Sequence, residues 1–178
     1  MTSAFKLLLL GDGGVGKTTL AQRYATGSFI SGAKMTIGAS FHSAHLAVGG
    51  DDIVLQIWDL GGEGRFRFFL PTLCAGASGA IFAYDVTRME SLLHVGDWMA
   101  IFQEQAAGIP VIMVGMKADL DQQRAVQPVD AEAIAAEQGI ADVIETSAMT
   151  GQNVELVFET ITSLMLNSPA AHKYEVPT

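Results

Sequence analysis

The most constraining feature of the chain is the segment GDGGVGKTT (residues 11–19), which directly follows the apolar run FKLLLL (residues 5–10). It fits the pattern G-x-x-x-x-G-K-[ST], with Lys17 and Thr18 at its end. Glycines let successive backbone N–H groups converge on phosphate oxygens, and the positive end of the following helix points the same way. Lys17 would add a point charge and Thr18 a hydroxyl ligand for Mg²⁺. Because the motif stands between a strand and a helix, it predicts a phosphate-binding loop rather than an ordinary glycine-rich turn.

Strand-like and helix-like segments alternate along the rest of the chain. Continuous apolar runs predict buried strands, and apolar spacing at i, i+3 and i+4 predicts helices. Two of the strands are joined by GGD, a hairpin signal. The order predicts a three-layer α/β/α domain of the P-loop NTPase type, with a six-stranded, mostly parallel sheet, one antiparallel hairpin strand and about five helices. The predicted strands are residues 5–10, 39–48, 52–60, 79–86, 110–116 and 141–146, and predicted helices include residues 17–26, 91–107, 130–139 and 152–166.

Composition narrows the class of protein. The chain has 178 residues, 49% of them hydrophobic, which suits a single domain over residues 1–178 with a flexible tail at 168–178. No apolar run approaches the roughly 20 residues of a membrane span, and the N-terminus has no signal-peptide core. With Cys74 as the only cysteine, no internal disulfide can form, so we expect a cytoplasmic location. The net charge of −9 is unevenly spread: residues 71–178 carry four Lys or Arg against fourteen Asp or Glu, and residues 1–70 carry six against five. This acidity disfavours nucleic acid and anionic lipid as partners.

Further motifs follow the phosphate loop in a fixed order: TIGASF (36–41), WDLGGEGRFR (58–67), MKAD (116–119) and ETSAMTGQNVE (145–155). Together with GDGGVGKTT they resemble a small GTPase of the Ras superfamily, closest in pattern to the Rab branch, over about residues 5–166. The resemblance implies a guanine-nucleotide switch that binds GTP or GDP with Mg²⁺ and hydrolyses GTP to GDP and phosphate. Signalling or trafficking-like regulation would pass through its two switch segments.

The resemblance also implies roles for individual residues. Thr36 matches the first-switch threonine that ligates Mg²⁺ and senses the γ-phosphate, Asp59 the acid that holds Mg²⁺ through water, and Gly62 the second-switch glycine whose N–H contacts the γ-phosphate. The expected metal set is Thr18, Thr36 and Asp59, and the expected catalytic set is Lys17, Thr36, Gly62 and Glu63. The expected nucleotide-binding set is Gly11, Asp12, Gly13, Gly14, Val15, Gly16, Lys17, Thr18, Thr19, Phe29, Thr36, Gly62, Lys117, Asp119, Ser147, Ala148 and Met149.

The base-binding loops depart from the family pattern. The usual Asn-Lys-x-Asp is Met116-Lys117-Ala118-Asp119 here. Asp119 would accept hydrogen bonds from both guanine N1–H and N2–H₂, and Lys117 would stack over the base. Met116 cannot make the hydrogen bonds of the missing Asn, so affinity should fall roughly 5- to 150-fold while guanine preference survives. In the second loop, the Ala148 N–H remains available for guanine O6, but Met149 replaces the usual Lys.

The second departure is Glu63, which stands where family members carry the glutamine that orients the attacking water. A carboxylate can accept a hydrogen bond from water but cannot also donate one to the γ-phosphate, and its charge opposes the phosphates. A Glu with a raised pKa could instead act as a general base. Gly13, the position kept small to admit the water, is retained. No cis arginine finger is evident from the sequence, so slow intrinsic turnover is expected.

Two alternatives stand beside the switch. A pseudo-GTPase that holds nucleotide as a scaffold is favoured by Glu63, Met116 and Met149, but disfavoured by the intact metal and phosphate residues. An ATPase or small kinase would lack the Lys-x-Asp loop after a late strand.

Effector, exchange and GTPase-activating proteins are the partners that the resemblance implies. Phe41 and Trp58 match two of three aromatics in the patch that Rab proteins present to effectors, with Leu73 at the third position. Packing on the sheet is an equally simple explanation for both rings. Because the chain ends in YEVPT with no cysteine, no membrane anchor of its own is expected. We also expect a monomer.

Overall fold

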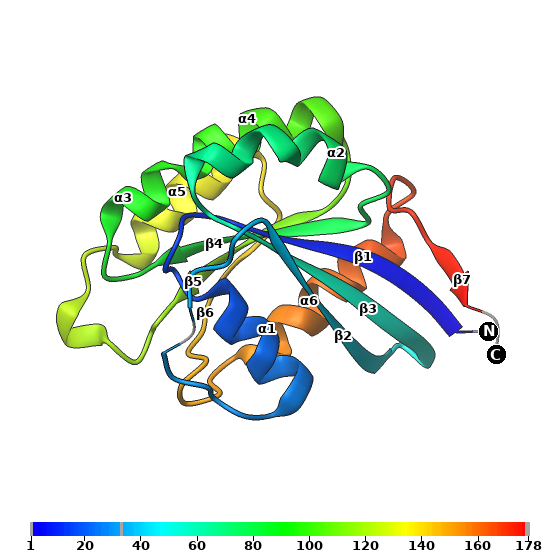
Figure 1. Cartoon of the computed structure of the whole chain (residues 1–178), viewed down its shortest axis with the longest axis horizontal. Helices are drawn as coiled ribbons and strands as arrows, with labels where there is room; N and C mark the ends of the chain where they lie inside the picture. The colour runs from blue at the N-terminus through cyan, green and yellow to red at the C-terminus, as the bar shows by residue number, and fades with distance from the viewer. Residues whose placement is uncertain (1, 33, 177–178) are drawn as a thin grey trace.

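The computed structural model describes residues 2–32 and 34–176, which are built around one twisted sheet (Figure 1). Across the sheet the strand order is β2-β3-β1-β4-β5-β6, with β7 beside β1. β2 runs antiparallel to β3 and β7 antiparallel to β1, while the other pairs are parallel. The strands are β1 (Thr2–Leu10), β2 (Ala39–Val48), β3 (Asp51–Leu60), β4 (Gly79–Asp85), β5 (Val111–Met116), β6 (Val143–Glu145) and β7 (Tyr174–Val176). The predicted α/β class with a mostly parallel sheet is confirmed.

Helices cover both faces of the sheet, as the predicted three-layer α/β/α arrangement requires (Figure 1). One layer contains α1 (Lys17–Thr26) and α6 (Val154–Asn167), and the other contains α2 (Leu70–Cys74), α3 (Met89–Leu93), α4 (Val95–Gln105) and α5 (Pro128–Gln138). Short 3₁₀ helices at Gly64–Phe69 and Asp121–Gln123 complete the described elements.

The apolar run of β1 explains why the sheet is central. Successive side chains of a strand point to opposite faces. Leu7 and Leu9 accordingly join the core under α1 and α6, whereas Leu8 and Leu10 join the core under α2 to α5. A strand buried on both faces needs apolar residues at every position, and this accounts for the uninterrupted LLLL.

The β2–β3 hairpin turns at Gly49 and Gly50, which have φ values of 63° and 92°. A two-residue turn with positive φ at both positions matches the right-handed twist of the flanking strands, and glycine adopts it without strain. The hairpin predicted from GGD is therefore present.

The structure differs from the sequence prediction in three places. The sheet has seven strands in the described residues instead of six, because Tyr174–Val176 pairs with Thr2–Ala4 of β1. Three residues of the segment expected to be a flexible tail therefore form a strand; residues 177–178 lie outside the described part. The helix predicted at 91–107 is divided into α3 and α4 at His94, and the short helix α2 was not predicted.

The tail is held by side chains as well as by strand pairing. The Ser78 hydroxyl donates to the carbonyl of His172 (2.5 Å), and the Tyr174 hydroxyl donates to the carbonyl of Gly76 (2.8 Å). The tail pairs with the start of β1, and Ser78 lies beside Lys6 in the middle of that strand, whereas the phosphate loop follows its carboxyl end. The sheet therefore separates the tail from the edge where nucleotides bind in folds of this kind.

Candidate functional site

The phosphate loop leaves β1 through a backbone conformation that only glycine adopts easily. Gly11 has a φ of 135°, and a Cβ on it would collide with the carbonyl oxygen of Ala83 on β4. The loop therefore passes directly against the neighbouring strand before it turns into α1. Within the loop, Gly14 and Gly16 also have positive φ values, 76° and 108°. These turns form one wall of a pocket of ≈ 240 Å³.

Lys17 is buried at the start of α1, inside the loop. Its ammonium group donates to the carbonyl oxygens of Gly11 (2.8 Å) and Asp12 (2.9 Å). Burial lowers the pKa of Lys17 to about 8; the charges of Asp59 and Asp12 act in the opposite direction. A cation that is poorly hydrated and lines the pocket is well prepared to meet a phosphate.

Hydroxyl groups from three parts of the chain converge on the carboxylate of Asp59, at the end of β3. Thr18 donates to Asp59 Oδ2, Thr36 Oγ1 lies 2.8 Å from Thr18 Oγ1 and 3.3 Å from the same Oδ2, and Ser40 Oγ donates at 3.2 Å. Asp59 is fully buried, and its Oδ1 has no hydrogen-bond partner in the described structure. Ser40 was not predicted as a site residue.

This group of oxygens fits Mg²⁺. A buried carboxylate oxygen without a donor is costly unless a cation or water satisfies it. Mg²⁺ prefers carboxylate, hydroxyl and water oxygens in a small octahedral shell. Thr18, Thr36 and Asp59 offer such oxygens and all line the same pocket as Lys17. The three predicted metal ligands are thus brought together.

Gly62 lies directly against the phosphate loop. A Cβ on it would overlap the backbone of Gly11, Asp12 and Gly13, so only glycine fits this approach. The next residue, Glu63, points to a different partner. Its Oε2 lies 2.5 Å from Nε of Arg65, and it does not line the pocket.

Two loops meet where the base-binding motifs were predicted, and one of them contributes Lys117 to the lining of the pocket. Asp119 accepts a hydrogen bond from the Ser147 hydroxyl (2.7 Å), and the Ala118 N–H donates to the carbonyl of Thr146 (3.1 Å). Lys117 donates to the carbonyl of Gly14 (2.9 Å) and pairs with Asp85 (2.8 Å). These contacts tie both base loops and the phosphate loop into one unit.

Other predicted base residues lie less centrally. Met116 is buried, and its methyl group would stand 3.4 Å from a Cβ on Gly16, so it packs on the phosphate loop without a hydrogen bond to it. Phe29 is 40% exposed and Met149 is 59% exposed, and neither lines the pocket. Ala148 is buried next to Ser147.

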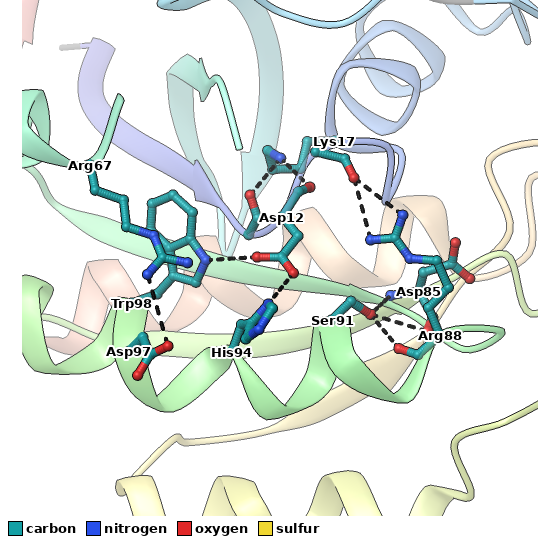
Figure 2. A network of polar contacts seen from close by, with 11 residues as sticks. Asp12, Lys17, Arg67, Asp85, Arg88, Ser91, His94, Asp97 and Trp98 are labelled. Atoms are coloured by element: carbon teal, nitrogen blue, oxygen red, sulfur yellow. Dashed lines mark hydrogen bonds and ion pairs between the residues drawn. The ribbon is translucent and has the colours of Figure 1, made fainter. Parts of the chain in front are cut away.

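Sequence reasoning missed a polar network behind the phosphate loop (Figure 2). Asp12 Oδ2 lies 2.5 Å from His94 Nδ1, and Asp12 Oδ1 accepts from the Trp98 indole N–H at 3.2 Å. The guanidinium of Arg67, in the 3₁₀ helix after Glu63, stacks 4.8 Å from the Trp98 ring. Arg88 donates to the carbonyl of Gly13 through both terminal nitrogens (3.4 Å each). These partners are more than 70 residues apart from the loop in sequence, so no local motif could reveal them.

A second, apolar pocket of ≈ 240 Å³ lies beside the phosphate site, between the segment after Gly62 and α4. Leu73 and Trp98 line it, together with Phe66 and Phe69. Nearby, Phe41 is 61% exposed and meets the Trp58 ring edge-on, with 4.6 Å between centroids. The aromatic residues predicted as a partner surface are therefore neighbours, with Phe41 largely open to solvent.

Comparison with known proteins decides the family. The family model described as "Ras family" matches residues 6–167, which include every residue lining the phosphate pocket. The chain belongs to the Ras family.

Several relatives of this Ras-family chain are Rab-type proteins. It is 40% identical to GTP-binding protein ypt3 of Schizosaccharomyces pombe over 158 residues, which cover 88% of this chain and 73% of that protein. It is 39% identical to Ras-related protein RABA2a of Arabidopsis thaliana (89% and 73% covered) and 37% identical to Ras-related protein Rab2BV of Beta vulgaris (88% and 73%). The predicted Rab-like small GTPase class is confirmed. No helix in the described part of this Ras-family chain is long and apolar enough to cross a membrane.

Proposed function

We propose that this Ras-family protein is a guanine-nucleotide switch that binds GTP or GDP with Mg²⁺, hydrolyses GTP slowly, and signals its state through residues 30–40 and 60–75. The observation that carries the proposal is the convergence of the Thr18 and Thr36 hydroxyls on buried Asp59, beside Lys17. This arrangement joins the phosphate loop to the first switch through one carboxylate. A nucleotide's terminal phosphate bound there would contact both segments, which is what a switch requires.

Each residue has a separate part in the proposed reaction. Lys17 and the loop N–H groups would neutralise and orient the phosphates. Thr18, Thr36 and Asp59 would hold Mg²⁺, which supplies positive charge against the developing charge of the phosphoryl oxygens. Gly62, already placed against the loop, would present its N–H to the terminal phosphate.

The slow rate follows from Glu63. In the proposed reaction this carboxylate accepts a hydrogen bond from the attacking water, but it has no proton to donate to a phosphate oxygen. Its pairing with Arg65 also draws the side chain toward a partner outside the pocket. Both effects would reduce the population of correctly oriented water.

Asp119 supports guanine as the base. Its Oδ1 accepts from Ser147, which fixes the carboxylate at the junction of the two base loops. A fixed carboxylate recognises the adjacent N1–H and N2–H₂ donors of guanine, and adenine offers no such pair. The absence of polar atoms at Met116 would weaken the binding without changing this preference.

Effector proteins would recognise the switch state through exposed aromatic groups. Phe41 on β2 is 61% exposed, and Phe68 and Phe69 within residues 60–75 are 70% and 46% exposed. Exposed rings of this kind mark protein contact surfaces. Since Trp58 packs against Phe41, movement of either switch would change the shape of this surface.

The first experiment identifies the nucleotide. Protein purified without added nucleotide is denatured, and the nucleotide that it releases is identified. In a separate measurement on native protein, bound GDP is competed with GTP, GDP and ATP. We expect GDP or GTP to co-purify and ATP to compete at least about 100-fold more weakly. Equal competition by ATP would contradict guanine recognition by Asp119.

The second experiment separates the switch from the alternative pseudo-GTPase scaffold, which the Glu63–Arg65 pair and the apolar Met116 favour. Single-turnover hydrolysis of bound GTP is compared between wild type and Lys17→Ala. Hydrogen exchange of residues 30–40 and 60–75 is compared between the GTP-analogue and GDP states. Hydrolysis above the Lys17→Ala rate, with state-dependent exchange, supports the switch; no difference in either supports the scaffold.

A further inference from the structure

Four consecutive carbonyl groups of the phosphate loop are held by three cationic side chains. Lys17 donates to the carbonyls of Gly11 and Asp12 from inside the loop. Lys117 donates to the carbonyl of Gly14, and Arg88 donates to that of Gly13. Lys17 and Lys117 line the nucleotide pocket, but Arg88 does not. Arg88 therefore holds the loop from outside the pocket, through the guanidinium contacts drawn in Figure 2.

The peptide that Arg88 holds is the one most able to rotate. It joins Gly13 to Gly14, and glycine on both sides leaves no Cβ to restrict its orientation. In a trans peptide the C=O of one residue and the N–H of the next point in opposite directions. A guanidinium that fixes the Gly13 carbonyl behind the loop thus directs the Gly14 N–H toward the pocket, where Gly14 is a lining residue.

One buried carboxylate places both of the cations that hold Gly13 and Gly14. Asp85 Oδ1 accepts from the backbone N–H (2.8 Å) and the hydroxyl (2.6 Å) of Thr87, which fixes the turn leading to Arg88. Its Oδ2 pairs with Lys117. Burial alone would raise the pKa of Asp85, but the hydrogen bonds from Lys117 and Thr87 outweigh it and hold the pKa below its usual value. Asp85 therefore stays ionised and keeps its partners in place at neutral pH.

Arg88 also carries charge that no acidic group cancels. Within the described residues, no carboxylate lies within ion-pair distance of its guanidinium, and its buried Nε has no partner. Its charge reaches the pocket, because it is one of the influences that lower the pKa of Lys17. In a chain of net charge −9, an unpaired cation behind a phosphate site favours a polyanionic ligand.

We propose that Arg88 is a positioning residue of the nucleotide site: it fixes the Gly13–Gly14 peptide so that the Gly14 N–H meets the phosphates, and it adds positive charge behind them. Given the nucleotide switch proposed above, on which this role rests, the ligand is the di- or triphosphate of a guanine nucleotide. Arg88 acts through the loop and does not touch the nucleotide.

The test uses the full chain loaded with GDP and Mg²⁺. Arg88→Gln removes the charge and keeps an amide donor, whereas Arg88→Lys keeps the charge and loses the two-pronged contact. Lys173→Gln, an exposed position in the tail, is the matched control for removal of one positive charge. GDP release is measured at low and high salt, and the β-phosphate resonance of bound GDP is recorded by ³¹P NMR. Urea unfolding of each nucleotide-free variant provides a measure of the fold.

We expect Arg88→Gln to release GDP about tenfold faster, in line with the loss of one weak charge-assisted hydrogen bond, with a shifted β-phosphate resonance and an unchanged unfolding midpoint. The GDP release rate of Arg88→Lys should lie between those of Arg88→Gln and wild type. If Arg88→Gln does not fold, the comparison of Arg88→Lys with wild type provides the test. Wild-type release rate and resonance in both Arg88 variants would overturn the positioning role. Failure of wild type itself to retain GDP would overturn the proposed function, and this role with it.

Discussion

The carboxylate of Glu63 faces the guanidinium of Arg65, with 2.5 Å between Oε2 and Nε. In the proposed reaction the Glu63 side chain orients the attacking water, and its pairing with Arg65 competes with that role. Glu63→Gln has an amide that both accepts from water and donates to a phosphate oxygen, and it lacks the charge that attracts Arg65. We predict that Glu63→Gln raises the single-turnover rate of GTP hydrolysis about 10- to 100-fold, comparable to the effect of one positioned donor at an active site. Rapid-quench measurement of phosphate release tests this.

Arg65→Gln is the matched control, because it frees Glu63 without changing it. We expect an increase of less than about fivefold, since the carboxylate still cannot donate. An Arg65→Gln rate equal to that of Glu63→Gln would mean that pairing, and not the missing donor, limits the reaction.

The Trp98 indole links the phosphate loop to α4. Its N–H donates to Asp12, and its ring is buried and lies against Arg67. We predict that Trp98→Phe, which keeps an aromatic ring and loses this hydrogen bond, lowers the free energy of unfolding by about 1–2 kcal/mol. Urea unfolding followed by circular dichroism measures the change. Trp58→Phe, at a half-buried ring on β3 that packs against the same core, controls for the change of ring and should lose less stability than Trp98→Phe; a similar loss in both would show that the Asp12 bond is not the cause.

Met116 fills space against the phosphate loop but offers no hydrogen bond. We predict that Met116→Asn increases GDP affinity about 5-fold or more, while the nucleotide-free protein loses about 1–2 kcal/mol of unfolding free energy through poorer packing. GDP titration and urea unfolding give the two values. Met99→Asn, a buried position of α4, should lose stability without any gain in affinity. Unchanged GDP affinity in Met116→Asn would contradict the proposed cost of this methionine.

Cys74 is a buried thiol at the end of α2. Burial raises its pKa from 9.0 to about 11, against the opposing charge of Lys6. Because the folded state holds the thiol proton more tightly, this group's contribution to stability is complete below pH 9 and is lost as the pH rises toward 11. We predict that the native protein does not react with Ellman's reagent at pH 8, and that wild type loses more stability than Cys74→Ala between pH 9 and 11. Rapid labelling of the native protein would contradict the burial of this thiol.

Residues close together in sequence were the ones that could be placed without a structure. Lys17 and Thr18 follow β1 within one short loop, so strand, turn chemistry and helix determine their positions. Asp59 required only the additional inference that the carboxyl ends of neighbouring parallel strands meet, and β3 does lie beside β1. Helix α1 and strand β2 begin and end at the predicted residues because glycines and apolar periodicity mark both ends.

Contacts between distant segments could not be placed in this way. Asp12 meets His94 and Trp98 only because α4 packs over β4 and β1, and no local pattern records that packing. Arg88 lies in a turn whose sequence gives no sign that the phosphate loop is its neighbour. The three-residue strand β7 is too short for a periodic signal, and it pairs with the start of β1, which β4 does not reach.

The pairing of β7 with β1 also has a mechanical consequence. Thr2 and Val176 are register partners, so the two ends of the described chain lie on adjacent strands (Figure 1). A force that pulls these two ends apart would break the backbone pairing of β1 with β7 one residue pair at a time, starting at Thr2 and Val176. The phosphate loop, at the far end of β1, would not bear this force. The β1–β7 pairing would therefore break at low force, and the released tail would extend before the force reaches the phosphate loop.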